Sequence, residues 1–345
     1  MGSVFGLVYN CNSNHDNNIK DYEPVNTYCE KKPLPLEYLS YNTKIKQYFL
    51  QLSYNNNNII LYKDRIQDDK ESFERRLNTL LLKRVKVDGT RIQDNVYIYD
   101  KYVYKFSTFN NINTIKDIYK CDIKNVLLPK YIYSKKENNQ YLEIYDYFSN
   151  GDLFNYLFEK KNIVLFDDKI NIFKKIVKII EECHQNDYTH RDIKCENILV
   201  DIDSNGEVQP ILIDLDYVMK SYQYLHFKGG TALYVAPEIM NTHNSSYSFK
   251  STDIWSLGVL FYIMIYQEVL WLQPHINDTN FNVYNSFIES NPDKSYWSEI
   301  VKENNKKYNI SEEHNLKIKN VLEFCLNINY SDRTNVSKIL DLLNV

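Results

Sequence analysis

The spacing of hydrophobic positions changes partway along the chain. Between residues 80 and 106 apolar side chains alternate with other residues at period two, which is typical of half-buried strands. Two alternating runs, 96–99 and 102–105, flank Asp100-Lys101. This arrangement predicts a tight β-hairpin.

Beyond Asn150 the hydrophobic period becomes that of a helix. Apolar residues follow the i, i+3, i+4 spacing of a buried helix face at Ile170, Phe173, Ile176, Val177 and Ile180. A second apolar run, 257–265, is too short to span a bilayer and predicts a buried core helix. Strands followed by helices indicate an α+β fold, with a small sheet lobe and a larger, mainly helical lobe.

The chain therefore divides into three predicted parts. Residues 1–74 are expected to form an N-terminal extension, partly disordered because residues 1 to about 32 are rich in Asn and Ser and have little periodicity. Residues 75–147 form the small lobe, and residues 148–345 form the large lobe.

Composition narrows the class of protein. The net charge is -4 and no dense group of Lys and Arg stands out, so we expect no nucleic-acid partner. The 6 cysteines are scattered without a Cys-x-x-Cys pair, which argues against a zinc site or a disulfide framework and favours a reducing compartment. With neither a signal peptide nor a transmembrane segment in the sequence, we expect a cytoplasmic protein. We also expect it to be a monomer.

The segment 190–197, His-Arg-Asp-Ile-Lys-Cys-Glu-Asn, carries the candidate chemistry. If the segment is a loop, a carboxylate (Asp192), an ammonium (Lys194) and a carboxamide (Asn197) can converge on one small volume. Phosphoryl transfer requires an oriented hydroxyl, positive charge near the transferred group and a bound magnesium ion. These side-chain types meet all three requirements.

This segment resembles the catalytic loop of eukaryotic-type protein kinases, and Lys194 favours the serine/threonine branch. The resemblance implies the bilobal protein-kinase fold, with a small antiparallel β-sheet lobe that carries one helix and a larger, mainly helical lobe. It also implies ATP and Mg²⁺ as cofactors, with a serine or threonine hydroxyl of a protein as acceptor. Asp192 would orient that hydroxyl, Lys194 would neutralise the γ-phosphate, and Asn197 would bind magnesium. Arg191 would contact a phosphorylated or acidic activation segment.

Further motifs of the family follow in the expected order. Asp214-Leu215-Asp216 matches the magnesium-binding Asp-Phe-Gly triplet, with Asp216 in place of the glycine. Asp214 would bridge the β- and γ-phosphates through metal. A side chain at position 216 would restrict backbone conformations at positive φ and add negative charge near the metal.

The segment 230–238 resembles the peptide-binding loop that ends in Ala-Pro-Glu. Within it, Thr231 would lie near Asp192 and Lys194 and favour serine or threonine substrates. Glu238 would form a buried ion pair with Arg333. Asp253, at the start of a central helix, would accept hydrogen bonds from the backbone of the catalytic loop.

The small lobe departs further from the family. Lys105 matches the strand lysine that contacts the α- and β-phosphates, although a strand lysine can also simply face solvent. The glycine-rich phosphate loop is missing, and only Gly89 could serve in its place. The helix carboxylate expected to pair with Lys105 is not a glutamate; Asp117 is the first candidate and Asp122 the second.

The segment 141–154 resembles the hinge between the lobes. Backbone groups of Asp146 and Phe148 would bond the adenine edge, Asp152 would lie near the ribose hydroxyls, and Tyr145 would close the rear of the nucleotide pocket. A core tyrosine is the alternative role of Tyr145.

Two modifications are suggested by position alone. An added phosphate at Ser221, Tyr222 or Tyr224 could pair with Arg191. The N-terminal Met1-Gly2 sequence partly fits a myristoylation signal, with Cys11 available for a second acyl chain, so Gly2 could carry a weak membrane anchor.

Two alternatives remain open at this level. The missing glycine loop, Asp117 and Asp216 favour a catalytically impaired pseudokinase that acts as a signalling scaffold. Retention of Lys105 and Asp192, together with Lys194, Asn197 and Asp214, favours catalysis. A small-molecule kinase of related fold is disfavoured by the peptide-binding loop at 230–238.

Overall fold

The computed structural model describes residues 89–344, with gaps at 94, 100–101, 108–111, 130, 136–139, 160–163, 222–228 and 242–247. The expected extension at 1–74, with Gly2 and Cys11, lies outside the described residues, as do Tyr222 and Tyr224.

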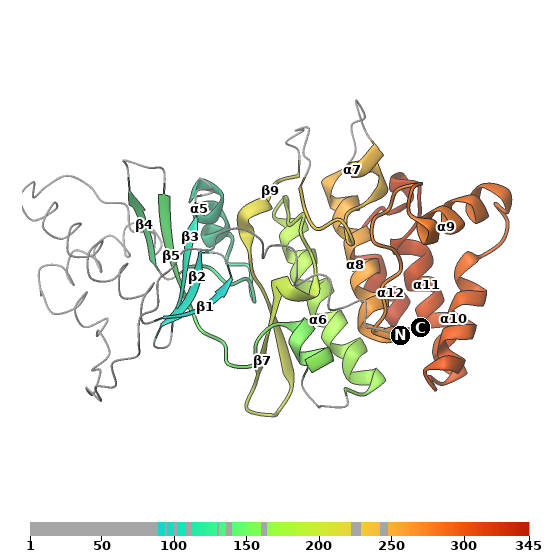
Figure 1. The fold of residues 1–345 in the computed structure, drawn as a ribbon, viewed down its shortest axis with the longest axis horizontal. Coiled ribbons are helices and arrows are strands. Elements are labelled where there is room, and N and C mark those ends of the chain that lie inside the picture. Colours follow the sequence, from blue (N-terminus) through green and yellow to red (C-terminus); the bar gives the residue numbers. More distant parts are fainter. Residues whose placement is uncertain are drawn as a thin grey trace, which may run out of the picture.

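A five-stranded antiparallel sheet, in the order β1-β2-β3-β5-β4, forms one end of the part of the chain that the structure describes (Figure 1). Its strands are β1 (Thr90–Gln93), β2 (Val96–Tyr99), β3 (Tyr102–Ser107), β4 (Tyr131–Lys135) and β5 (Gln140–Asp146). The register pairs Tyr99 with Tyr102, which confirms the predicted hairpin between β2 and β3. The helix α5 (Ile112–Cys121) lies beside the sheet and buries Ile115 and Ile118.

Two short antiparallel ladders lie between the sheet and the helical end (Figure 1). The strands β7 (Ile198–Ile202) and β8 (Val208–Leu212) form the first, and β6 (Tyr188–Thr189) and β9 (Met219–Lys220) form the second. A single turn, η4 (Cys195–Asn197), leads into β7, and another, η5 (Leu215–Tyr217), follows β8. Together these ladders hold residues 190–197 and 213–218 close to each other.

The helical lobe is built around two long helices. In α6 (Phe166–Gln185) the predicted apolar face is buried, as expected from its 3.6-residue period. The helix α8 (Phe249–Tyr266) is apolar on all sides and buried along nearly its whole length, which confirms the predicted core helix. The remaining helices are α7 (Pro237–Asn241), α9 (Thr279–Ser290), α10 (Tyr296–Lys307), α11 (Asn315–Cys325) and α12 (Ser337–Leu343).

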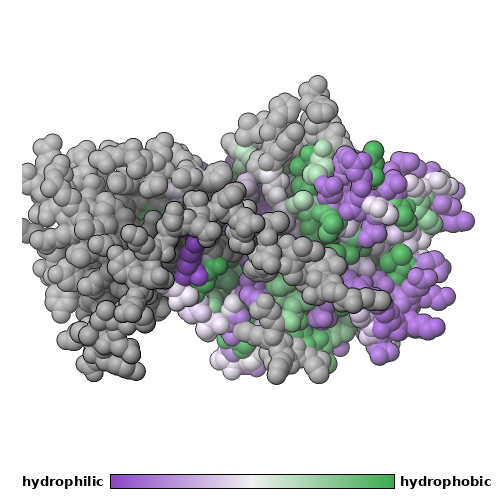
Figure 2. All heavy atoms as spheres, in the orientation of Figure 1, coloured by the Kyte–Doolittle hydropathy of each residue, from purple (hydrophilic) through white to green (hydrophobic). Residues whose placement is uncertain are grey.

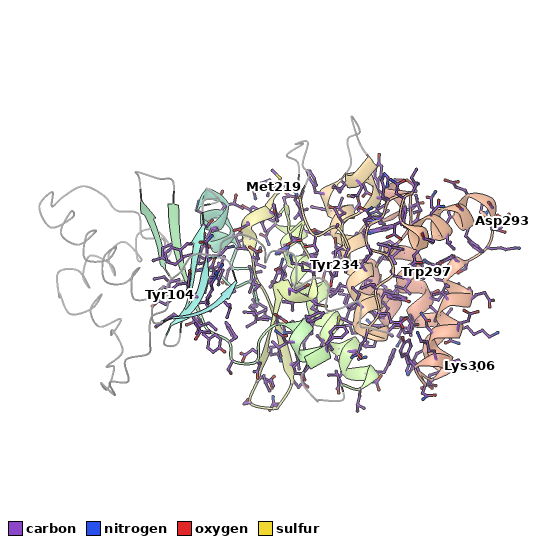
Figure 3. All side chains as sticks on the ribbon, in the orientation of Figure 1. Tyr104, Met219, Tyr234, Asp293, Trp297 and Lys306 are labelled. Carbon is purple, nitrogen blue, oxygen red and sulfur yellow. The ribbon has the colours of Figure 1, made fainter. Side chains whose placement is uncertain are left out.

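Close packing in this lobe depends on Gly258 in the middle of α8. A Cβ at this position would lie 2.5 Å from the Cβ of Cys325 on α11, so only glycine allows the two helices to approach this closely. Tryptophans fill the adjacent core: Trp255 stacks on Trp271 with ring centroids 5.6 Å apart. Trp297, labelled in Figure 3, continues this aromatic core toward α10.

The exposed part of the helical end is largely hydrophilic, with separate hydrophobic patches (Figure 2). Among the described residues, Cys121, Cys183, Cys195 and Cys325 are free thiols. None of the described helices combines the length and apolar character required to cross a bilayer.

Candidate active site

The segment 190–197 is attached to the helical lobe by one buried carboxylate. Asp253 in α8 is fully buried and accepts hydrogen bonds from the backbone N–H groups of His190 at 2.9 Å and Arg191 at 2.8 Å. The ring Nε2 of His184 lies 2.9 Å from the same carboxylate. These bonds hold Arg191 in a left-handed conformation with φ of 70°, which is costly for a residue with a side chain.

The polar side chains of the segment converge as the sequence predicts. The carboxylate of Asp192 is 2.8 Å from the ammonium of Lys194 and accepts a 2.8 Å hydrogen bond from the amide nitrogen of Asn197. The hydroxyl of Thr231 donates to the other oxygen of Asp192 at 2.8 Å and accepts from Lys194 at 2.8 Å. The result is a closed network around one buried carboxylate.

Gly230 allows Thr231 to reach this network. Its φ is +90°, and a Cβ there would lie 2.8 Å from the backbone oxygen of Arg191. Both the backbone conformation and the close approach exclude a side chain at this position. Gly230 and Thr231 thereby lie against the segment 190–197, and Tyr234, labelled in Figure 3, is buried.

Asn197 and Asp214 lie at the same end of the β7–β8 ladder. The register pairs Ile198 with Leu212, and the N–H of Ile213 donates to the carbonyl of Asn197 at 2.9 Å. The ring nitrogen Nε2 of His190 lies 3.0 Å from the carbonyl of Ile213 and connects the two segments again. Asp214 has φ of 63°, a left-handed conformation, and leads directly into the η5 turn after the ladder.

Lys105 from β3 reaches across to this second segment. Its ammonium lies 2.7 Å from Asp214 and 2.8 Å from Asp216, and its side chain is only 19% exposed. A solvent-facing role for this lysine is therefore wrong. Burial acts to lower the pKa of Lys105, but the two carboxylates outweigh burial and raise that pKa above its usual value.

The two aspartates respond differently to the shared lysine. Burial alone would raise the pKa of Asp214, yet Lys105 holds this pKa below its usual value. The pKa of Asp216 is raised, by burial first and by the neighbouring charge of Asp214 as well. Asp214 is thus the more strongly ionised carboxylate of the pair.

The predicted helix partner of Lys105 is wrong. Asp117 bonds Lys120 on the same helix at 2.8 Å, and its side chain is 50% exposed. Asp122 follows the helix, is exposed and has φ of 50°. An aspartate reaches less far than a glutamate, and a lysine three residues further along the helix surface is the nearer partner.

Gly89, the one glycine that could have served in place of the missing phosphate loop, does not lie in the turn between β1 and β2. Gly89 precedes β1, and its neighbour Thr90 pairs with Ile98, away from the level of Lys105. The turn at that level is the one between β1 and β2, where Asn95 has φ of 62° and its carbonyl accepts from the N–H of Phe106 at 2.8 Å. Asparagine tolerates this conformation better than most residues, so the tight turn forms without glycine.

The hinge residues are held by local bonds. The carbonyl of Phe148 accepts from the N–H of Gly151 at 3.2 Å, and Asp146 ends β5 opposite Tyr102. The carboxylate of Asp152 accepts from the backbone and side-chain nitrogens of Asn155, at 2.7 and 3.1 Å, and caps a short turn, η3 (Asn155–Glu159). The cap fixes the direction in which this carboxylate points.

A buried carboxylate near Lys105 was missed at the sequence level. Glu143 on β5 is paired in register with Lys105 on β3, so the two side chains leave the same face of the sheet. Glu143 is 4% exposed and accepts a 2.5 Å hydrogen bond from the hydroxyl of Tyr145. Burial raises the pKa of Glu143. The alternation of β5 could have indicated this face, because Glu143 and Tyr145 are two residues apart.

Arg333 and Glu238 form the expected ion pair. One guanidinium nitrogen of Arg333 donates to both oxygens of Glu238, at 2.8 and 2.7 Å, and a second donates to the carbonyl of Ser251 at 2.9 Å. Both side chains are buried, so the pair fixes the end of the 230–238 segment to the helical core.

Two residues of the regulatory hypothesis, Arg191 and Ser221, lie within the described residues. The guanidinium of Arg191 lies 4.5 Å from the ring centroid of Phe249 and contacts the sulfur of Met219, labelled in Figure 3. The hydroxyl of Ser221 is buried in this conformation, and the N–H of this residue donates to the carbonyl of Asp187 at 2.7 Å.

The donor set fits a magnesium ion that is shared with phosphate. The side-chain nitrogen of Asn197 donates its hydrogen bonds to Asp192. The side-chain oxygen of Asn197 is therefore available as a metal ligand, together with the carboxylate of Asp214. Within the described ranges no three acidic, histidine or cysteine side chains form a metal cluster of their own. Mg²⁺ commonly takes one or two protein oxygens and completes its shell with water and phosphate oxygens, so two ligands suffice.

Comparison with known proteins agrees with this geometry. The profile of the protein kinase domain matches residues 84–342. Human NUAK family SNF1-like kinase 2 is 36% identical over 123 residues, which cover 36% of this chain and 19% of that protein. The probable serine/threonine-protein kinase MARK-C of Dictyostelium discoideum is 33% identical over 148 residues, covering 43% and 18%.

A third relative, the carbon catabolite-derepressing protein kinase of Secale cereale, is 34% identical over 122 residues, covering 35% of this chain and 23% of that protein. The matched segments span about a fifth of the length of these relatives. The family profile covers most of the chain, and the residues that form the site lie within it. This chain belongs to the protein kinase family.

Proposed function

We propose that this chain transfers the γ-phosphoryl group of ATP, with Mg²⁺, to serine or threonine hydroxyls of protein substrates. The observation that carries the proposal is the closed network of Asp192, Lys194, Asn197 and Thr231, placed beside Asp214 and Lys105. Such positioning and electrostatic stabilisation account for nearly all of the catalysis in phosphoryl transfer.

Each residue has a separate task in this proposal. Asp192, fixed by three donors, orients the acceptor hydroxyl and accepts its proton. Lys194 places positive charge beside the transferred group, and Lys105 contacts the α- and β-phosphates. Asn197 and Asp214 hold Mg²⁺, which neutralises charge on the phosphate oxygens when it is bound.

The acceptor and the nucleotide contact other parts of the site. Thr231 narrows the space beside Asp192, which favours the short side chains of serine and threonine over tyrosine. Backbone groups of Asp146 and Phe148 bond the adenine edge, and Asp152 lies toward the ribose. The names of the matched relatives, which include serine/threonine-protein kinases, support the same assignment.

A transfer assay with radiolabelled ATP and a generic basic protein tests the proposal. Wild-type protein should label serine or threonine, and Asp192→Asn should reduce labelling by about a thousandfold, on the scale of lost acid–base and positioning contributions. Equal labelling by both proteins, or no labelling by either, would refute phosphotransfer by this site.

A pseudokinase is the second candidate, favoured by the ion pairs of Lys105 with two carboxylates and by the side chain at Asp216. A thermal-shift measurement with Mg²⁺-ATP distinguishes the two functions when combined with the transfer assay. Stabilisation by nucleotide without transfer supports the pseudokinase, whereas transfer excludes it.

A further inference from the structure

Lys105 needs a carboxylate partner that remains in place when nucleotide and metal are bound. Asp214 pairs with Lys105 here, but the proposed function assigns Asp214 to the metal ion. The helix α5 provides no substitute, since Asp117 is paired with Lys120 and half exposed. Lysine is a flexible side chain, and ordering it at the phosphates costs rotamer entropy that a fixed partner reduces.

Asp216 has the geometry of such a partner. Its Oδ2 lies 2.8 Å from the ammonium of Lys105, and its side chain is 23% exposed. The left-handed backbone of Asp214, with φ of 63°, leads directly into the η5 turn. Because of that turn, the carboxylates at 214 and 216 both face Lys105, and a residue without a side chain at 216 would leave one of these positions empty.

The surroundings of Lys105 support a replacement from this direction. Glu143 lies opposite Lys105 in the sheet register, but its carboxylate is bonded to Tyr145. Its electrostatic effect reaches the lysine and adds negative charge from the sheet side. Asp216 is thus the partner of Lys105 that makes direct contact and is not assigned to the metal.

We propose that Asp216 is a positioning residue that holds Lys105 against the nucleotide phosphates, in place of a helix carboxylate, since Asp117 of α5 pairs with Lys120 instead. This inference rests on the proposed function, since it assumes that Lys105 contacts phosphate and Asp214 binds metal. In this proposal the third residue of the Asp214-Leu215-Asp216 triplet supports nucleotide binding. Asp216 pairs with Lys105, which the shorter carboxylate of Asp117 does not reach.

Direct measurement of Mg²⁺-ATP affinity, by calorimetry on the full chain, tests the assignment. Asp216→Gly introduces the residue usual in the family, and Asp216→Asn keeps the shape while removing the charge. Both variants should raise Kd for Mg²⁺-ATP by about tenfold, the scale of one lost charge-assisted hydrogen bond. The matched control Asp117→Asn removes a carboxylate of the same length and should leave Kd unchanged.

A cycle with Lys105→Met separates positioning from a general structural effect. If Asp216 acts through the lysine, Asp216→Asn should change Kd by less than about twofold in the Lys105→Met background. In the transfer assay, KM for ATP should rise in Asp216→Asn more than kcat falls. Asp216→Glu keeps the charge and should recover part of the affinity.

The outcomes for inference and function are distinguishable. Unchanged or tighter binding by Asp216→Gly and Asp216→Asn, or an equal loss in the Lys105→Met background, would overturn the positioning role even if Asp192-dependent transfer were present. Weaker binding in both variants without any transfer by the wild type would retain the positioning role and refute the kinase activity. A wild type that binds no nucleotide would overturn both.

Discussion

The buried pair of Arg333 and Glu238 leads to a quantitative prediction about stability. Arg333 is 2% exposed and Glu238 is 9% exposed, and the guanidinium makes three hydrogen bonds at 2.7 to 2.9 Å. Arg333→Met keeps much of the side-chain volume but leaves the carboxylate of Glu238 buried and unpaired. Breaking such a pair costs about 3–5 kcal/mol of the free energy of unfolding.

Urea unfolding followed by tryptophan fluorescence measures this loss, since Trp255 lies under Arg333 with 5.3 Å between the guanidinium carbon and the ring centroid. The double variant Arg333→Met with Glu238→Leu removes the unpaired charge and should recover much of the stability. Lys307→Met breaks an exposed pair with Glu268 and serves as the control, with the unfolding midpoint unchanged.

Arg333→Met must lose stability, and the double variant must recover much of it. A loss below about 1 kcal/mol in Arg333→Met would mean that the buried pair behaves like a surface ion pair. A double variant no more stable than the single one would show that the cost does not come from the unpaired carboxylate. Either result would refute the account, provided that the urea dependence of the unfolding free energy is unchanged.

Three further predictions concern the site and its supporting core. Gly230→Ala should lower phosphotransfer by about tenfold or more, because strain of about 1–3 kcal/mol would displace the catalytic segment; Gly206→Ala, also at positive φ but in open space, is the control and should keep full activity. Asp253→Asn should lower activity by at least about tenfold, since an amide cannot accept both backbone N–H groups, and wild-type activity with an intact circular dichroism spectrum would contradict this. Burial raises the pKa of the thiols of Cys183, Cys195 and Cys325, so their contribution to stability is complete below the ordinary pKa of 9.0 and decreases as pH rises above it, by about 1.4 kcal/mol per pH unit for each thiol. Peptide mapping after alkylation at pH 8 should find these three unmodified in the folded protein and Cys121 modified; equal labelling of all four would contradict the burial.

The sequence predicts the polar site of the helical lobe well because its residues are close together in the sequence. Asp192, Lys194 and Asn197 lie within one short segment, so a loop is enough to bring them together. The position of Lys105 follows from strand alternation. Its partners do not, because the ion pair with Asp214 joins residues 109 positions apart and depends on the turn after β8.

The errors in the small lobe have a common physical origin. Assigning Asp117 to Lys105 assumed that a helix carboxylate faces the sheet, whereas the bond to Lys120 depends on which face of α5 is exposed. Naming Gly89 as the one possible substitute for a phosphate loop considered glycine alone, whereas Asn95 takes a positive φ in the turn between β1 and β2. Sequence alone gives neither the rotation of a helix about its axis nor the register of its neighbouring strands.

Gly258 lies in the contact between α8 and α11, on the same helix as Asp253, which bonds the loop backbone. Asp253 and Gly258 are about 8 Å apart along α8, at 1.5 Å per residue. A larger residue at 258 would push α11 away or rotate α8, and rotation would carry the Asp253 carboxylate out of line with the loop backbone. An inherited change in the interior contact between two helices, remote from any nucleotide or peptide, would therefore appear as a defect in turnover.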